Sequence, residues 1–341
     1  MKNWIKALII TCLAVPTTQL FVLNPFEQAT DFSMSDFYIR TANKMRLSSI
    51  CNQMAIIPVD NLSRLEIAQI AEKADFFGAK TIALDVFMNW HTDVDKETAD
   101  ALSACENLIL PSSLTENFIS PVFKEIKNAQ YGYTNLECNW DGAKIRFFSS
   151  KKEESISFAA AACGIYDSKQ GIIRYDCKEF EIIYPEELSN TNVQGKILFI
   201  GNLNDFSDCH PTPIGVLPGV MIHAYIARTI IENCAPKPMS KVLGYILTFM
   251  IVVLLFMMHA HNNTINGDFA NFIMRIVQFV TTIILYMVGA ILFVKFNIYA
   301  DVSLIILLIT AMLLVFDIIY GCFSIADMMR NKSEKRKRRK K

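Results

Sequence analysis

The sequence lacks the short motifs that mark several classes of enzyme. It contains no Gly-x-Ser-x-Gly nucleophile elbow, and neither of the two common glycine-rich phosphate loops appears. No nucleophile, base and oxyanion hole can be assembled from its residues. It also lacks the internal repeats and polar, interrupted apolar segments that are typical of transporters. The sequence therefore predicts no catalytic turnover and disfavours transport.

Net charge is also absent, but this balance hides a separation of charge along the chain. Lys+Arg and Asp+Glu both number 33. Acidic residues outnumber basic ones between Asn24 and Lys237, whereas the tail from Arg330 to Lys341 holds nine basic residues and one acidic residue. Membrane anchoring and attraction to anionic lipid, worth on the order of 1 kcal/mol per base, account for this tail. Membrane lipid is therefore a predicted partner, and nucleic acid is not.

Charged residues are nearly missing from four long apolar runs. These runs are Ala7–Leu23, Val242–Met258, Ile276–Val294 and Val302–Tyr320. Their length and composition predict transmembrane helices. The first run, which follows Lys2 and Lys6, also fits a secretory signal peptide. An uncleaved anchor is favoured because no small-x-small cleavage site is present.

The positions of the basic residues predict how the chain crosses the membrane. Lys and Arg beside membrane helices stay in the cytoplasm. This rule places residues 1–6, the loop 259–275 and the tail 321–341 inside, and residues 24–237 outside. We therefore predict a multi-pass protein of the bacterial inner membrane. One transmembrane helix precedes its extracytoplasmic domain and three follow it.

The outer region 24–237 begins with a strand–helix–strand pattern. The apolar run Met54–Val59 predicts a buried strand, and Ser63 and Glu66 have the spacing of a capping box, so a helix is expected from about Arg64 to Gly78. Further strands are predicted at Lys80–Phe87, Leu108–Leu110, Phe180–Tyr184 and Lys196–Ile200, and further helices at Glu97–Cys105 and Val220–Glu232. The predicted fold class is α/β with a largely parallel or mixed sheet, its first two strands being parallel neighbours.

Several segments of this region resemble a known family, and they occur in the family's order. They are Asp31–Arg40, Gly78–Phe87, Asp141–Arg146, Gly195–Gly201 and Pro218–Ala224. Together they resemble the CHASE domain of the second type, an extracellular sensory module of bacterial receptors that carry cyclases, histidine kinases and other signalling enzymes. The resemblance implies a sensory role, three membrane helices after the domain, and compatibility with a homodimer.

The chain departs from the family pattern after its last predicted helix. No kinase, cyclase or phosphodiesterase domain follows Tyr320 in the sequence. We therefore expect a receptor-like protein that senses an unidentified small molecule or envelope component and reports through a separately encoded partner. The alternative is a non-catalytic envelope scaffold that uses the same domain to bind an envelope partner.

Five residues are candidates for binding a ligand. Asp60 and Asp85 follow two parallel strands, and ligands of open α/β sheets bind at the carboxyl ends of strands. Capping of turns and bonding to nearby backbone are the structural alternative for both residues. Asp208, His210 and His223 are candidates from the region after the strand Lys196–Ile200. With Asp205 and Cys209 they are metal-ligand types, but their spacing fits no standard site, so neither a metal nor a cofactor is predicted.

Cysteines are frequent in the outer region, whose predicted compartment permits disulfides. They are Cys51, Cys105, Cys138, Cys163, Cys177, Cys209 and Cys234. Cys51 and Cys105 both precede predicted strands and form a conceivable pair, whereas buried free thiols are the equal alternative.

Overall fold

The computed structural model describes residues 31, 33–45, 51–115, 118–126, 129–138, 143–175, 179–263, 267–303 and 305–310. The chain divides into two compact units. We call Thr30–Lys237 with Phe293–Ile298 the domain unit, and Met1–Ala29, Pro238–Leu292 and Tyr299–Lys341 the helical unit. The predicted anchor Ala7–Leu23 and the tail 321–341 lie outside the described residues, as does part of Val302–Tyr320.

A parallel six-stranded sheet forms the centre of the domain unit, with the strand order β4-β3-β2-β10-β1-β9. The strands are β1 (Cys51–Pro58), β2 (Thr81–Asp85), β3 (Leu108–Ser112), β4 (Gln130–Tyr133), β9 (Phe180–Ile182) and β10 (Ile197–Gly201). The predicted α/β class with a mainly parallel sheet is therefore confirmed.

The prediction that the first two strands are neighbours is wrong. β1 and β2 are parallel, but β10 lies between them, with Ile197 opposite Met54 on one side and opposite Thr81 on the other. All residues of β10 are buried. A strand that is apolar on both faces belongs at the centre of a covered parallel sheet, so the later strand takes the inner position.

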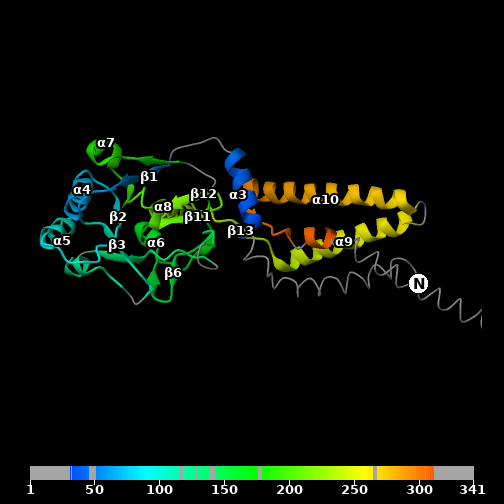
Figure 1. Cartoon of the computed structure of the whole chain (residues 1–341), viewed down its shortest axis with the longest axis horizontal. Helices are drawn as coiled ribbons and strands as arrows, with labels where there is room; N and C mark the ends of the chain where they lie inside the picture. Colours follow the sequence, from blue (N-terminus) through cyan, green and yellow to red (C-terminus); the bar gives the residue numbers. More distant parts are fainter. Residues whose placement is uncertain are drawn as a thin grey trace, which may run out of the picture. The chain divides into compact units, whose positions relative to one another are not determined.

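Helices cover both faces of this sheet (Figure 1). Residues of α4 (Arg64–Phe76) and α5 (Asp95–Ser103) share one buried cluster with Leu198 and Ile200 of β10. Because successive side chains of a strand point to opposite faces, Phe199 faces the other way. Its ring lies 6.3 Å from that of Phe158 in α6 (Phe158–Ala162), and α8 (Gly219–Ile231) packs beside α6 on that face.

The capping box predicted at the start of α4 is confirmed. The Ser63 hydroxyl accepts a hydrogen bond from the backbone N–H of Glu66, and the Glu66 carboxylate accepts one from the backbone N–H of Ser63. Gly78 follows the helix with a φ of 81°, in the left-handed region. Both signals act over a few residues, which is why they can be read locally.

The remaining elements are short or lie at the ends of the domain unit. Helix α3 spans Met34–Met45. The others are η2 (Pro121–Glu125), β5 (Phe147–Ser149), β6 (Lys151–Lys152), β7 (Ser155–Ile156), β8 (Gln170–Ile172), η3 (Pro185–Glu187), α7 (Asn190–Val193), η4 (Phe206–Asp208), β11 (Cys209–Thr212), β12 (Gly215–Pro218), β13 (Lys237–Pro238) and β14 (Ile298–Tyr299). The strands β11 and β12 form an antiparallel hairpin immediately before α8.

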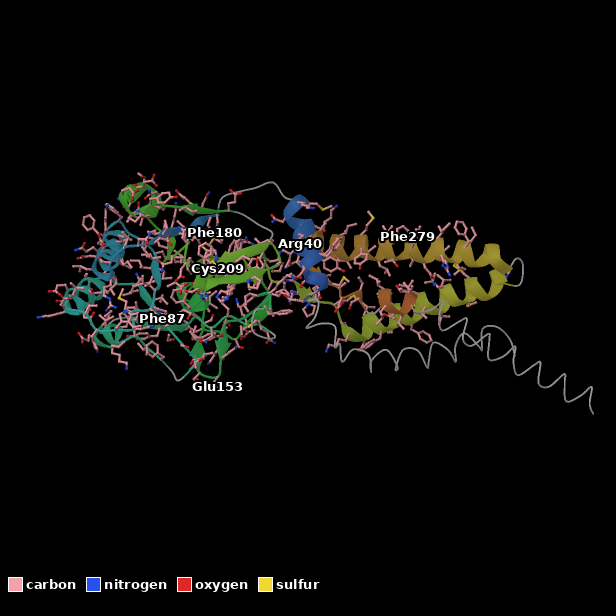
Figure 2. All side chains as sticks on the ribbon, in the orientation of Figure 1. Arg40, Phe87, Glu153, Phe180, Cys209 and Phe279 are labelled. Carbon is pink, nitrogen blue, oxygen red and sulfur yellow. The ribbon has the colours of Figure 1, made fainter. Side chains whose placement is uncertain are left out.

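Two long helices, α9 (Lys241–Asn263) and α10 (Gly267–Phe296), carry most of the helical unit's described residues. Within the described residues, Phe272–Phe296 is long and apolar enough to cross a membrane, with a mean hydropathy of 2.3, and the apolar stretch Lys241–Leu255 is shorter. Large apolar side chains point outward from both helices, among them Met250 and Phe279, the latter labelled in Figure 2. Outward-facing apolar surface of this kind is suited to lipid.

Candidate functional site

A cavity of about 610 Å³ lies at the carboxyl ends of the central strands. Asp85 comes from the end of β2, and the residues after β4 and β10, the hairpin β11–β12 and helix α8 supply the other walls. Four of the five predicted site residues line it: Asp85, Asp208, His210 and His223. This volume is in the range of small-molecule binding sites.

The parallel register explains why these residues meet. Gly201 at the end of β10 pairs with Pro58 of β1 on one side and with Asp85 of β2 on the other. The chain then passes through residues 202–218 to α8, whose N-terminus approaches Gly201 closely. A Cβ on Gly201 would lie 2.9 Å from two side-chain carbons of Val220. Glycine at this position therefore lets α8 start directly beside the strand end.

Asp60, the fifth predicted residue, is not among the residues that line this cavity. Its carboxylate accepts hydrogen bonds from the backbone N–H groups of Leu203, at 3.1 and 3.2 Å, and of Asn204, at 2.8 Å. The geometry fits the structural alternative considered for this residue, because Asp60 fixes the chain that leaves β10.

Asp85 differs from Asp60 in having no such donors. No hydrogen bond or ion pair of the Asp85 carboxyl is found among the described residues, and the half-buried group lines the cavity. Burial, together with the nearby Asp208 carboxylate, raises the pKa of Asp85 to about 8. Asp85 is therefore a largely protonated carboxyl at neutral pH.

Asp208 lies over the first turn of α8. Its Oδ2 atom would be 2.5 Å from a Cβ on Gly219, so only glycine leaves room for the carboxylate at this helix start. A negative group is favourable there because the helix dipole and the free N–H groups of the first turn are positive. His210 Nε2 lies 3.4 Å from Asp208 Oδ1.

His223 belongs to α8 and is 4% exposed. Its ring packs edge-on against Phe158 with 5.2 Å between centroids, and Nδ1 has no hydrogen-bond partner. Burial lowers the pKa of His223 to about 4, against the opposing effect of Asp208. The imidazole is therefore neutral at physiological pH.

The metal-ligand types that cluster in the sequence do not converge on one point. Within the described residues no group of three or more His, Cys, Asp or Glu side chains has the geometry to hold a metal ion. Asp205 instead accepts hydrogen bonds from the N–H and hydroxyl of Ser207, at 2.9 and 2.6 Å. What the cavity offers chemically is a set of carboxyl and imidazole groups for binding a polar ligand.

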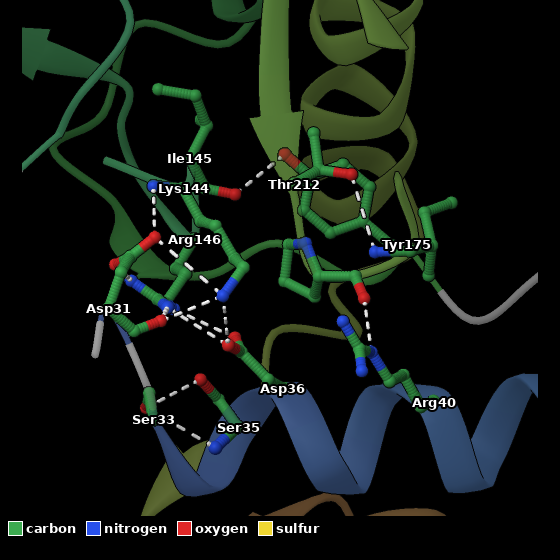
Figure 3. Close-up of polar contacts among 12 residues, drawn as sticks. Asp31, Ser33, Ser35, Asp36, Arg40, Lys144, Ile145, Arg146, Tyr175 and Thr212 are labelled. Carbon is green, nitrogen blue, oxygen red and sulfur yellow. Dashed lines mark hydrogen bonds and ion pairs between the residues drawn. The ribbon is translucent and has the colours of Figure 1, made fainter. Parts of the chain in front are cut away.

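A second polar cluster, which the sequence did not predict, joins helix α3 and the residues before it to the rest of the domain unit (Figure 3). We call Asp31, Asp36, Lys144 and Arg146 the Arg146 cluster. Arg146 binds Asp36 with both ends of its guanidinium, Nε to Oδ1 at 2.7 Å and Nη2 to Oδ2 at 2.9 Å. Its Nη1 lies 2.7 Å from Asp31 Oδ1, and its Nη2 also donates to the Asp31 carbonyl.

Lys144 completes the Arg146 cluster, with its Nζ 2.8 Å from the Asp31 carbonyl and 3.3 Å from Asp36 Oδ2. Burial acts to raise the pKa of Asp31, but the hydrogen bonds from Arg146 and Lys144 outweigh it and hold that pKa below its usual value. Both segments were noted for their resemblance to the family, yet more than a hundred residues separate the partners. Opposite charges on two segments that resemble the family were therefore the only signal in the sequence.

The conceivable disulfide between Cys51 and Cys105 is absent, because both cysteines are free and buried. Burial raises the pKa of the Cys105 thiol to about 12, so this group behaves as a small apolar residue. Cys138 is free and exposed.

Comparison with known proteins identifies the family of the chain. The model of the CHASE2 domain matches residues 10–260, most of the chain. No curated protein and no solved structure matches. CHASE2 domains are sensory extracellular domains, which agrees with a cavity built inside a domain rather than with a closed structural core. By this match over most of its length, the chain belongs to the CHASE2 domain family.

Proposed function

We propose that this protein is a non-catalytic membrane receptor. Its domain unit lies outside the cytoplasm, binds a signal in the cavity, and passes the bound state through the flanking helices to a separate partner protein. Family membership supports the sensory role. The charge pattern supports four membrane spans with both termini in the cytoplasm.

One observation carries the proposal, namely that helix α8 connects the cavity to the end of α10 inside the domain unit. His223 on α8 lines the cavity, and Thr229, less than two turns further on, accepts a hydrogen bond from the backbone N–H of Arg174 at 3.0 Å. The Arg174 side chain binds Asn297 Oδ1 at 2.6 Å and lies 4.8 Å from the centre of the Phe293 ring. A shift of α8 on binding therefore has a short route to the end of α10.

Helix α3, at the start of the domain unit, also packs against the end of α10. Tyr38 of α3 is fully buried, and its ring lies 5.7 Å from that of Phe293. Helix α3 is itself held by the Arg146 cluster through Asp36. The two chain segments next to predicted membrane spans are thus packed against each other, which is the arrangement a transmitting domain needs.

Asn297→Gly tests transmission. Asn297 has a φ of 55°, so glycine keeps the backbone conformation while removing the amide that binds Arg174 and the carbonyl of Ala235. In cells we expect this variant and a deletion of the domain unit to lose the same condition-dependent changes in cytoplasmic signalling output, measured as transcript levels, at unchanged membrane abundance. Asn233→Gly, at another left-handed position, is the control and should respond like the wild type.

The opposite result identifies a scaffold. If domain deletion changes no cytoplasmic output, and cross-linking in the native membrane recovers only envelope-side proteins, transmission is refuted.

Labelling of Cys138 tests the proposed topology. Because this thiol is exposed, a membrane-impermeant maleimide added to intact spheroplasts should label the wild-type chain and label Cys138→Ser less. Labelling of Cys138 only after the membrane is permeabilised would place the domain unit in the cytoplasm and contradict the proposal.

A further inference from the structure

The cavity contains a carboxyl group that the fold itself does not use. The other acids described above all have partners within the protein. Asp60 accepts hydrogen bonds from the backbone N–H groups of Leu203 and Asn204. Asp205 accepts one from the backbone N–H of Ser207, and Asp36 is paired with Arg146. Asp85, in contrast, has neither a hydrogen bond nor an ion pair among the described residues, and its side chain is partly exposed to the cavity. A carboxyl group that faces a cavity and has no partner in the protein is available to bind a ligand there.

The cavity wall is acidic. Asp85, Asp205 and Asp208 line it, and no Lys or Arg is found among the described residues that do so. His210 accompanies Asp208 at 3.4 Å. An anionic ligand would meet repulsion from the carboxylates of Asp205 and Asp208, with no basic side chain of the described wall to offset it.

The N-terminus of α8 does not change this sign. Such a helix start is favourable for anions, but the carboxylate of Asp208 already lies against Gly219 at that position. The positive end of the helix is therefore occupied by a group of the protein.

His223 supplies the second, independent observation. Its side chain lines the cavity, is 4% exposed, and leaves Nδ1 without a partner. The backbone of Thr134 bonds to the same ring. In the tautomer protonated on Nε2, Nδ1 is a free acceptor in the cavity that Asp85 and Asp208 also line. An ammonium group has three N–H donors and no acceptor, so it suits a cavity that offers acceptors of this kind.

We infer that this cavity binds a small organic cation with an amine head group, held by Asp85 and Asp208 with His223 Nδ1 as a further acceptor. The volume of about 610 Å³ admits a metabolite-sized molecule. Phe87 adds an aromatic wall, which is favourable for a cation. The inference rests on the proposed sensory function and names the chemical class of its signal.

The test uses the full chain in phosphatidylcholine nanodiscs, because that lipid has no net charge and presents no free amine. Putrescine and ethanolamine are titrated by calorimetry, with 1,4-butanediol and succinate as neutral and anionic probes of similar size. Empty nanodiscs correct for binding to lipid. We expect saturable binding of an amine probe and none of the diol or the dicarboxylate.

Asp85→Asn keeps the shape of the side chain and removes the carboxyl group that would ionise beside a bound cation, so it should weaken amine binding by about tenfold or more. The matched control is Asp100→Asn, on the exposed side of α5 and outside the cavity wall, which should bind like the wild type. The inference is overturned if neither amine binds, if Asp85→Asn binds an amine as well as the wild type, or if succinate is preferred.

This result is separable from the proposed function. If no amine binds but deletion of the domain unit still abolishes the cytoplasmic response, the ligand class is wrong and the receptor proposal stands. If amines bind through Asp85 but neither the deletion nor Asn297→Gly alters any output, the site is real and the receptor proposal fails.

Discussion

Replacing Arg146 by methionine should destabilise the folded protein by about 3–5 kcal/mol, the typical cost of removing one partner from a buried ion pair. Arg146 and Asp36 are each 3% exposed, and the guanidinium binds Asp36 through two nitrogens. Without it, Asp36 retains Lys144, at 3.3 Å, as its only cationic partner among the described residues. Thermal or denaturant unfolding of the full chain in detergent measures the loss.

Lys152→Met is the matched control for Arg146→Met. Lys152 also forms an ion pair, 3.2 Å from Glu137, but its side chain is 42% exposed. Exposed pairs contribute about 0–1 kcal/mol, so this variant should be nearly neutral. Adding Asp36→Asn to Arg146→Met should recover part of the loss, because it removes the unpaired charge. Equal effects of Arg146→Met and Lys152→Met would show that the Arg146 cluster does not hold α3 to the domain.

Replacing Asp85 by asparagine should stabilise the protein near pH 8 by about 1–3 kcal/mol, an order-of-magnitude figure from the raised pKa. The carboxyl ionises near 3.8 when unfolded and at about 8 in the folded protein. Between these values the folded state holds one more proton than the unfolded state, so stability falls as pH rises. The gain from Asp85→Asn should therefore be absent near pH 4 and grow toward pH 8.

Titration of His223 changes the stability with pH in the opposite direction, so its contribution must be distinguished from that of Asp85. Its pKa is lowered to about 4, so its contribution to stability rises between about pH 4 and 6.5. Comparing Asp85→Asn with the wild type at each pH cancels this contribution, provided that His223 is unchanged. A stability difference that is independent of pH would contradict the raised pKa of Asp85. Together with the binding test, a gain in stability accompanied by a loss of amine binding would mark Asp85 as a residue kept for its ligand.

The local signals of the sequence were sufficient for individual elements. Ser63 and Glu66 are three residues apart, and the capping box that they form starts α4 at the expected residue. Apolar runs such as Ile197–Gly201 became strands because few other conformations bury every side chain of so short a segment. The pairing of strands was less accessible. β10 lies between β1 and β2 in the sheet, although more than a hundred residues separate it from either strand in the sequence. No local pattern of residues predicts a pairing between segments so far apart.

The candidate site shows the same division. Parallel strands brought Asp60 and Asp85 to one edge, as predicted, but the two carboxyls then differ because the amides of Leu203 and Asn204 reach only Asp60. The sequence offers no means of choosing between them. The burial of His223 likewise depends on Phe158, a residue of another helix whose ring packs against the imidazole.

By itself, the sequence determined the α/β class and the identity of most strands and helices, because hydropathy and capping are properties of neighbouring residues. The membrane-bracketed organisation is a prediction from the same local properties and from charge. Only the tertiary structure decided which acid is left unpaired in the cavity and which basic residue holds the entry to the domain. Arg146 has its role because its partner Asp36 lies more than a hundred residues away in the chain but next to it in space. Asp85 has its role because no distant residue of the described chain donates a hydrogen bond to it. Such roles depend on burial and on distance in space, and neither is written in the local order of residues.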